Sequence, residues 1–231
     1  MVEILKIEIR SIFRRIFFGS ASSPKRYSEW LKKLGIEIGE GTIFFDPVNT
    51  IVDIQNPKLL KIGRNVRVTS GCKILTHDFS SSVIGGKYGE CIGALGTVEI
   101  GDNVFLGMNS IIFRNTKIGD NVIIGAGSVV SGFVESDSVY AGVPAKKISS
   151  LEDFYQKRKS KVEFEIKNVI SKVDTSDETE LWRYLREYAC FFQDSPEELK
   201  KGQMMDTGYY ELCEKFYNNN NYPYKIGDFC K

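Results

Sequence analysis

The sequence predicts a mainly β protein, a parallel β-helix of hexapeptide repeats with an N-terminal helical segment and a C-terminal helical extension. Three observations indicate this fold. Aliphatic residues recur every six positions, glycine often follows them, and small or β-branched residues form a second column four positions further on. A period of six fits neither an α-helix nor an ordinary amphipathic strand. It fits a solenoid in which each hexapeptide supplies one short strand and one corner of a triangular coil.

The aliphatic column is predicted to point into the coil, beside the companion column. The inward column is expected at Ile62, Val68 and Ile74, and again at Ile100, Leu106, Ile112, Ile118, Ile124 and Val130. The companion column is expected at Thr42, Val48, Ile54, Leu60, Val66, Cys72, and then Val104, Ser110, Thr116, Val122, Ser128 and Val134. The following glycines, such as Gly101 and Gly119, are expected to permit tight corners. A β-sandwich, the alternative, has strands at a variable spacing of roughly 8–12 residues.

Three segments follow from this register: an N-terminal helical segment at 1–35, the coil at 36–148 and a helical extension at 149–231. The first segment has eight basic and three acidic residues, a net charge of +5. In the extension, helical apolar spacing and capping boxes predict helices. The apolar face consists of Leu181, Leu185, Tyr188 and Phe192, and the boxes pair Ser149 with Glu152 and Thr175 with Glu178.

One break interrupts the repeat, and the single histidine of the chain lies at its start. Ile74 and Ile100 are 26 positions apart, which six does not divide, so residues 80–97 are predicted to project as a loop. His77 follows Ile74 by three positions, at a corner that should face outward. Catalytic residues commonly lie on loops held by a rigid scaffold, and an imidazole can accept a hydroxyl proton near neutral pH. A solvent-exposed surface histidine is the alternative.

Three stretches resemble the hexapeptide-repeat acetyltransferases, especially those that O-acetylate sugars, such as the maltose, galactoside and capsule or lipopolysaccharide enzymes. The matching text is LTHDF at 75–79, VEIGDNVFLGMNSIIFRNTKIGDNVIIGAGSVVSG at 98–132, and YAGVPAKKI at 140–148. The resemblance implies a left-handed parallel β-helix and a homotrimer with an active site at each subunit interface. It also implies direct transfer from acetyl-CoA to a sugar or polysaccharide precursor, with His77 as general base and no metal.

The resemblance also implies positions for the ligands. Contacts to acetyl-CoA are expected from Phe105, Met108, Gly125, Ala126, Ser131, Lys146 and Lys147. Apart from the resemblance, the loop at 80–97 is expected to shape the acceptor pocket, with contacts from Asp78, Tyr88 and Glu90. The backbone N–H groups at Gly125 and Ala126 match the turn that meets the thioester, while the two lysines match phosphate contacts. Gly132 departs from the pattern, because some relatives have lysine there. The group that orients His77 stays open between Asp78, Glu90 and a backbone carbonyl.

Composition narrows the remaining alternatives. A single histidine excludes the γ-type carbonic anhydrases, which share the coil but hold zinc through three histidines. A net charge of +1 gives no reason to expect nucleic acid, and five cysteines without a CxxC pair are typical of a reduced, cytoplasmic protein. An antibiotic (xenobiotic) acetyltransferase and a non-catalytic scaffold remain as alternative functions.

The N-terminal segment has two interpretations. Its aromatic and aliphatic residues alternate with arginines, as in Phe13, Arg14, Arg15 and Ile16, a pattern that interfacial helices share. Weak association with a membrane surface is therefore one expectation. The other is an amphipathic helix packed on the trimer.

Overall fold

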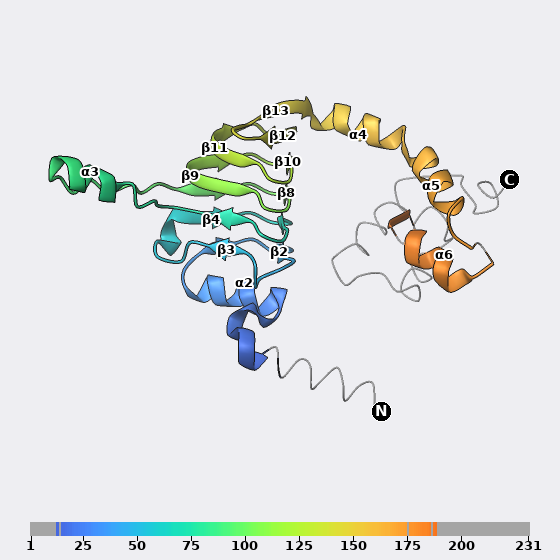
Figure 1. Cartoon of the computed structure of the whole chain (residues 1–231), viewed down its shortest axis with the longest axis horizontal. Helices are drawn as coiled ribbons and strands as arrows, with labels where there is room; N and C mark the ends of the chain where they lie inside the picture. Colours follow the sequence, from blue (N-terminus) through green and yellow to red (C-terminus); the bar gives the residue numbers. More distant parts are fainter. Residues whose placement is uncertain (1–12, 14, 175, 186, 189–231) are drawn as a thin grey trace. The chain divides into compact units, whose positions relative to one another are not determined.

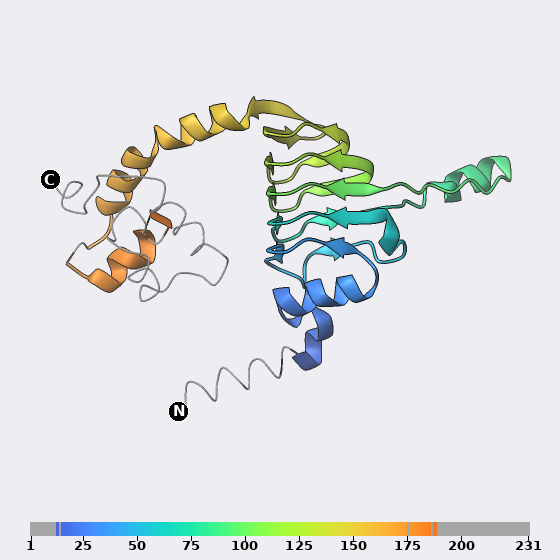
Figure 2. The ribbon, with the colours of Figure 1, turned by 180° about the vertical axis from the view of Figure 1, so that it is seen from behind.

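Short parallel strands wind around a buried aliphatic core in a left-handed parallel β-helix (Figure 1). The structure, a computed structural model, describes residues 13, 15–174, 176–185 and 187–188. The chain divides into two compact units, Met1–Phe154 and Tyr155–Lys231. The β-helix belongs to the first unit, whose stacked coils are seen from behind in Figure 2.

The coil has three faces, and each face is a ladder of parallel strands. The first comprises β1 (Glu37–Ile38), β4 (Leu60–Ile62), β7 (Val98–Ile100) and the ends of β9 (Ile111–Ile118) and β11 (Val129–Val134). The second comprises β3 (Ile51–Val52), β6 (Lys73–Ile74) and the beginnings of β9 and β11. The third comprises β2 (Ile43–Phe44), β5 (Arg67–Val68), β8 (Val104–Leu106), β10 (Val122–Ile124) and β12 (Ser138–Gly142).

The inward column forms the core, as the six-residue period predicts. All nine of its residues, from Ile62 to Val130, are at most 2% exposed. The prediction for the companion column is wrong at two upstream positions, because Val48 and Ile54 are 41% and 43% exposed. Phe44 and Val52 fill the core there instead. A turn beginning at Asp46, and the short 3-10 helix η2 (Pro57–Leu59), add residues to the first coils and displace the register.

Asparagine, rather than the repeated glycine, takes the left-handed corner conformation. Positive φ values of 54–59° occur at Asn65, Asn103, Asn109, Asn115, Asn121 and Asp137. The repeat glycines Gly101 and Gly119 do not have positive φ, so the predicted reason for them is wrong. A Cβ atom on Gly101 would lie 2.7 Å from the Gly119 carbonyl oxygen of the next coil. Glycine is therefore required because successive coils approach each other closely at this column.

The two ends of the coil are covered differently. At the N-terminal end, the 3-10 helix η1 (Gly19–Ser22) leads into α2 (Pro24–Lys33), which packs Tyr27 and Leu31 onto the first coil. At the other end, β13 (Ala145–Ser150) pairs antiparallel with β12. The helix α4 (Leu151–Lys159) follows, and its cap is Ser150, which accepts a hydrogen bond from Asp153 N (3.0 Å). The predicted box at Ser149 is thus one residue early.

Residues 80–97 leave the coil as the projecting arm that the break in the repeat predicts (Figure 1). The arm contains a helix that the sequence did not predict, α3 (Ser81–Tyr88). The outgoing and returning segments of the arm pair with each other at the coil. There His77 forms an antiparallel bridge with Leu95, and Gly96 N donates to Thr76 O (2.9 Å). The root of the arm is therefore held at a fixed position on the coil.

The second unit contains a small helical core. The helices α5 (Val162–Ile170) and α6 (Glu178–Leu185) bury Ile166, Ile170, Leu181 and Leu185 against each other. This confirms the predicted apolar face at Leu181 and Leu185, with Tyr188 packed beside it. Phe192 and Thr175, which belong to the same predictions, lie outside the described residues.

Candidate active site

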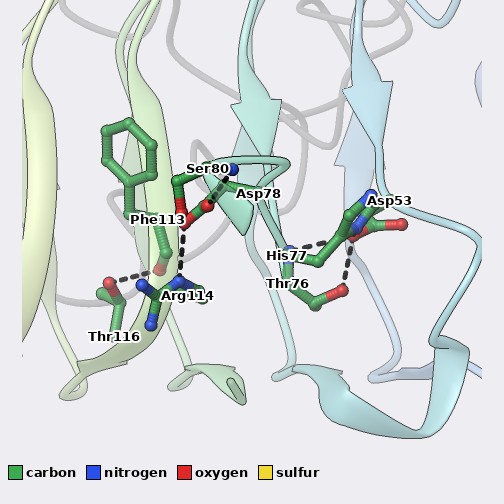
Figure 3. A network of polar contacts seen from close by, with 8 residues as sticks. All are labelled: Asp53, Thr76, His77, Asp78, Ser80, Phe113, Arg114 and Thr116. Atoms are coloured by element: carbon green, nitrogen blue, oxygen red, sulfur yellow. Dashed lines mark hydrogen bonds and ion pairs between the residues drawn. The ribbon is translucent and has the colours of Figure 1, made fainter. Parts of the chain in front are cut away.

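His77 pairs with a buried carboxylate at the root of the arm. Its Nδ1 atom lies 2.5 Å from Oδ2 of Asp53 (Figure 3). Asp53 directly follows β3, and His77 lies three residues after β6, so the parallel pairing of Val52 with Ile74 brings the two side chains together. The Asp53 side chain is 2% exposed and that of His77 is 32% exposed. The coil thus buries the acid and presents the imidazole to solvent.

Hydrogen bonds keep the buried carboxylate charged. Burial acts to raise the pKa of Asp53, but hydrogen bonds from Thr76, the backbone of Gln55 and His77 outweigh it and lower that pKa. Thr76 donates both its backbone N–H (3.1 Å) and its hydroxyl (2.5 Å) to Oδ2. A charged Asp53 accepts the Nδ1–H of the imidazole, which leaves the lone pair on Nε2. Among the described residues, Nε2 has no hydrogen-bond partner, as a general base requires.

Asp53, rather than Asp78, Glu90 or a backbone carbonyl, is the group that pairs with His77 Nδ1. Asp78 instead accepts hydrogen bonds from Ser80 N (2.9 Å) and Arg114 Nε (2.9 Å), as Figure 3 shows. The hydrogen bonds from Ser80, followed by the one from Arg114, hold the pKa of Asp78 well below its usual range. Asp78 therefore fastens the arm to the next coil. Tyr88 and Glu90 are exposed at the end of α3, and the fold of one chain does not bring them to His77.

Four of the residues expected to contact acetyl-CoA lie along one edge of the coil. Phe105 on β8 pairs with Ile123 on β10, eighteen residues further on, and Phe105 is 41% exposed. At the adjoining corner Gly127 N donates to Met108 O (2.7 Å), so Met108 lies beside Ala126. Phe105, Met108, Gly125 and Ala126 thus form a continuous strip across two coils.

The turn at 141–145 lies beside this strip, in a coil that is two residues shorter than the one before it. Ile124 pairs with Tyr140, sixteen residues on, whereas Leu106 pairs with Ile124, eighteen residues on. Between Val130 and Gly132, β11 has two residues fewer than β9 has between Ile112 and Thr116, so the last coil is shorter and Pro144 does not lie opposite Ala126. Ala141 lies against Gly125 instead, and Gly142 N donates to the Ser128 hydroxyl (3.2 Å).

The backbone donors available to a thioester are fewer than the sequence suggests. Gly125 N donates to Tyr140 O (2.8 Å), and Gly127 N donates to Met108 O. Ala126 N has no acceptor among the described residues, and Ala126 itself is exposed. Of the three consecutive N–H groups, only this one can donate to a ligand without breaking a bond between coils.

The basic residues and Ser131 occupy different parts of the coil. Lys146 and Lys147 lie on β13, opposite Ala141 and Tyr140. Lys147 forms an ion pair with Glu135 (2.7 Å), and this hydrogen bond raises the pKa of Lys147. Lys146 has no ion-pair partner in the part of the chain that the structure describes. Ser131 is exposed in β11.

The two halves of the candidate site lie at opposite corners of one coil face. Lys73, Ile111 and Val129 pair side by side across the second face. Ala126 precedes this face, whereas His77 follows it, so a strand separates them within one chain. His77 and the turn at Gly125–Ala126 therefore lie on opposite sides of this face within one chain. These features, a hexapeptide coil with a histidine–carboxylate pair at the root of a projecting arm, define an acyltransferase of the β-helix class.

Comparison with known proteins agrees with this class. A family model described as bacterial transferase hexapeptide (six repeats) matches residues 97–132. Protein CapG from Staphylococcus aureus is 39% identical over 149 residues, which cover 64% of this chain and 83% of CapG. The chain therefore belongs to the hexapeptide-repeat acetyltransferase family, and it is an acyltransferase.

Solved structures show a more distant likeness. A hexapeptide-repeat acetyltransferase from Vibrio cholerae, VCA0836, has a TM-score of 0.43 and 19% identity, with 64% of this chain and 93% of that one covered. A maltose O-acetyltransferase from Clostridium difficile 630 has a TM-score of 0.40 and 25% identity, with coverages of 62% and 84%.

Proposed function

We propose that the protein is an O-acetyltransferase that moves the acetyl group of acetyl-CoA directly to a hydroxyl of a sugar or polysaccharide precursor. The observation that carries this proposal is the pairing of His77 Nδ1 with the buried Asp53 carboxylate, while Nε2 has no partner in the described part of the chain. Such a pair can remove a proton from a neutral hydroxyl, the step that an oxygen acceptor needs before it attacks a thioester.

The proposed reaction needs one proton relay and one oxyanion donor. His77 Nε2 takes the hydroxyl proton while the acceptor oxygen bonds to the thioester carbon, and Asp53 stabilises the imidazolium that forms. The carbonyl oxygen becomes an oxyanion, for which the Ala126 N–H is the candidate donor. Collapse of the intermediate breaks the carbon–sulfur bond, and the imidazolium returns its proton to the sulfur of CoA. The products are the acetyl ester of the acceptor and the free thiol of CoA, so atoms and protons balance.

A homotrimer would complete the site. The faces of the coil carry apolar side chains directed outward, among them Ile51 (51% exposed), Phe105 (41%) and Phe113 (36%). Cover by a second chain removes such side chains from water, and it also allows His77 of one chain to face Ala126 of the next. Light scattering at micromolar concentration should give three times the mass of the chain, and a monomer would contradict the proposal.

The acceptor class rests on the resemblance to the sugar-acetylating branch of the family. An antibiotic hydroxyl is the alternative acceptor, and a scaffold without activity is the alternative of another kind. A panel of sugars, nucleotide sugars, amino sugars and antibiotics, assayed by release of the CoA thiol, separates all three. We expect turnover with a saccharide. Turnover only with an antibiotic would support the first alternative, and none at all would support the second.

The decisive variant for the proposed chemistry is His77→Ala. Because loss of a general base typically slows a reaction about 10²–10⁴-fold, turnover should fall by that factor while the CD spectrum stays unchanged. Turnover near that of the wild type would show that His77 is not the base.

A further inference from the structure

An apolar cluster lies uncovered at the N-terminal end of the coil. Phe13, Ile16, Phe17 and Phe18 are 56%, 71%, 74% and 45% exposed. Residues 15–18 are helical and lead through η1 into α2, whose other side packs on the first coil. Four large apolar side chains exposed within six residues indicate a surface that meets a partner.

Cationic side chains lie beside this cluster. Arg15, Arg26 and Lys33, together with Glu29 and Trp30, line an open recess of about 320 Å³. In the part of the chain that the structure describes, none of these three cations has an ion-pair partner. The recess can therefore receive an anionic group without first breaking an ion pair.

Charge is strongly segregated along the chain. Residues 1–35 carry a net charge of +5, whereas the whole chain carries +1, so residues 36–231 carry −4. The excess of positive charge therefore lies in the segment that also exposes the apolar cluster. Because the remaining chain is acidic, an anionic partner is attracted to this segment in preference to the rest of the molecule.

We propose that this N-terminal face, formed by Phe13, Arg15, Ile16, Phe17, Phe18, Arg26 and Lys33, binds the surface of a bilayer that contains anionic phospholipids. Aromatic and aliphatic side chains would enter the headgroup region, and the cations would meet lipid phosphates. None of the helices among the described residues is long and apolar enough to cross a membrane.

A second copy of the chain fits this face less well. A twofold contact brings the same patch of both chains together, so the cations of one copy would lie against those of the other. The position of the face also suits a bilayer. It lies at the end of the coil opposite β13, so docking there leaves the sides of the coil and the arm open (Figures 1 and 2).

Vesicle co-sedimentation of the full-length chain tests the proposal. The probes are vesicles of phosphatidylcholine alone and vesicles with about one third phosphatidylglycerol. We expect binding only to the anionic vesicles, and weaker binding as salt rises. Arg15→Gln with Lys33→Gln should weaken binding about 30-fold, because each cation near an anionic surface contributes a factor of roughly five. Phe13→Ser with Phe17→Ser should weaken it about tenfold or more.

Matched controls remove similar side chains elsewhere. Phe133→Ser removes a phenylalanine that is 67% exposed on the coil, and Lys157→Gln with Lys172→Gln removes two exposed lysines of the second unit. All variants should keep the CD spectrum of the parent, and the controls should keep vesicle binding.

Three results would overturn the proposal. The first is equal sedimentation with both kinds of vesicle, or with neither. The second is a change in oligomer mass in the phenylalanine variants with vesicle binding intact, which would make the face a contact between chains. The third is tighter binding to DNA than to anionic vesicles, where the DNA binding is lost in the Arg15→Gln, Lys33→Gln variant and kept in the Phe13→Ser, Phe17→Ser variant.

Discussion

Asp53→Asn isolates the contribution of the carboxylate to catalysis without changing the size of the side chain. Asp53 accepts hydrogen bonds on both oxygens, from Gln55 N on one and from Thr76 and His77 on the other. An asparagine has one acceptor oxygen, so one of the two sets must face an NH₂ group. If that set includes His77, the imidazole accepts at Nδ1 and keeps its proton on Nε2, where it cannot act as a base.

The magnitude follows from the charge that is lost. When His77 becomes an imidazolium, it faces a carboxylate whose charge centre is about 4 Å away, and an effective dielectric constant of about 20 gives roughly 4 kcal/mol. Removal of that attraction should slow kcat about a thousandfold. The KM for acetyl-CoA should change less than about twofold, because the Asp53 side chain is 2% exposed, is buried beside His77 and does not reach the cofactor.

The assay is release of the CoA thiol with the best acceptor from the panel. Asp46→Asn is the matched control, since Asp46 is a half-buried aspartate of the same coil that accepts hydrogen bonds from Asn49 and Ser70. The double variant Asp53→Asn with His77→Ala should be no slower than His77→Ala alone, because the carboxylate acts through the imidazole. Losses that multiply in the double variant, or an Asp53→Asn enzyme with more than about a third of normal kcat, would refute this role.

Three further predictions concern the coil, the cofactor and the end cap. Gly101→Ala should lower the unfolding free energy in urea by about 2 kcal/mol, because its Cβ would meet the Gly119 carbonyl at 2.7 Å. Gly86→Ala, in open space on α3, should be neutral or slightly stabilising, and equal effects would contradict the reasoning. Lys146→Ala with Lys147→Ala should raise the KM for acetyl-CoA about tenfold and spare that for the acceptor; unchanged acetyl-CoA binding would misplace the phosphates. Burial raises the pKa of Tyr27 to about 12. Because the unfolded chain therefore loses this proton at a lower pH than the folded chain, the free energy of unfolding should fall by up to about 3 kcal/mol as pH rises from about 10 to 12. Tyr27→Phe should reduce that fall in urea titrations, and an identical pH dependence in the variant would count against it.

The sequence predicts the coil best where its repeat is uninterrupted. From Ile100 to Val130 each inward residue is buried, because a fixed period leaves only one register that fills the core. Upstream, the turn at Asp46 and the helix η2 are local insertions that a period cannot detect, so the period places Val48 and Ile54 in the companion column although both are exposed. The repeat glycines were recognised, but their cause is a contact between coils, which no single hexapeptide contains.

The candidate site, too, is predicted from the sequence only in part. His77 is identifiable from its motif and from the break in the repeat beside it. Asp53 was missed because it lies in the irregular part of the coil, 24 positions before His77, and only the pairing of β3 with β6 brings the two together. The free N–H of Ala126 also depends on the neighbouring coils, since they occupy the donors on either side of it.

The direction of β13 decides how copies of this chain can associate. A stack of parallel coils presents unpaired backbone groups at each end and would otherwise be a template for endless head-to-tail growth. Here the last rung is reversed, since β13 runs antiparallel to β12, and a helix closes the first rung through Tyr27 and Leu31. An incoming coil would meet a strand of the opposite direction at one end and a helix at the other. At both ends of the described coil, these elements therefore oppose head-to-tail stacking of coils along the coil axis.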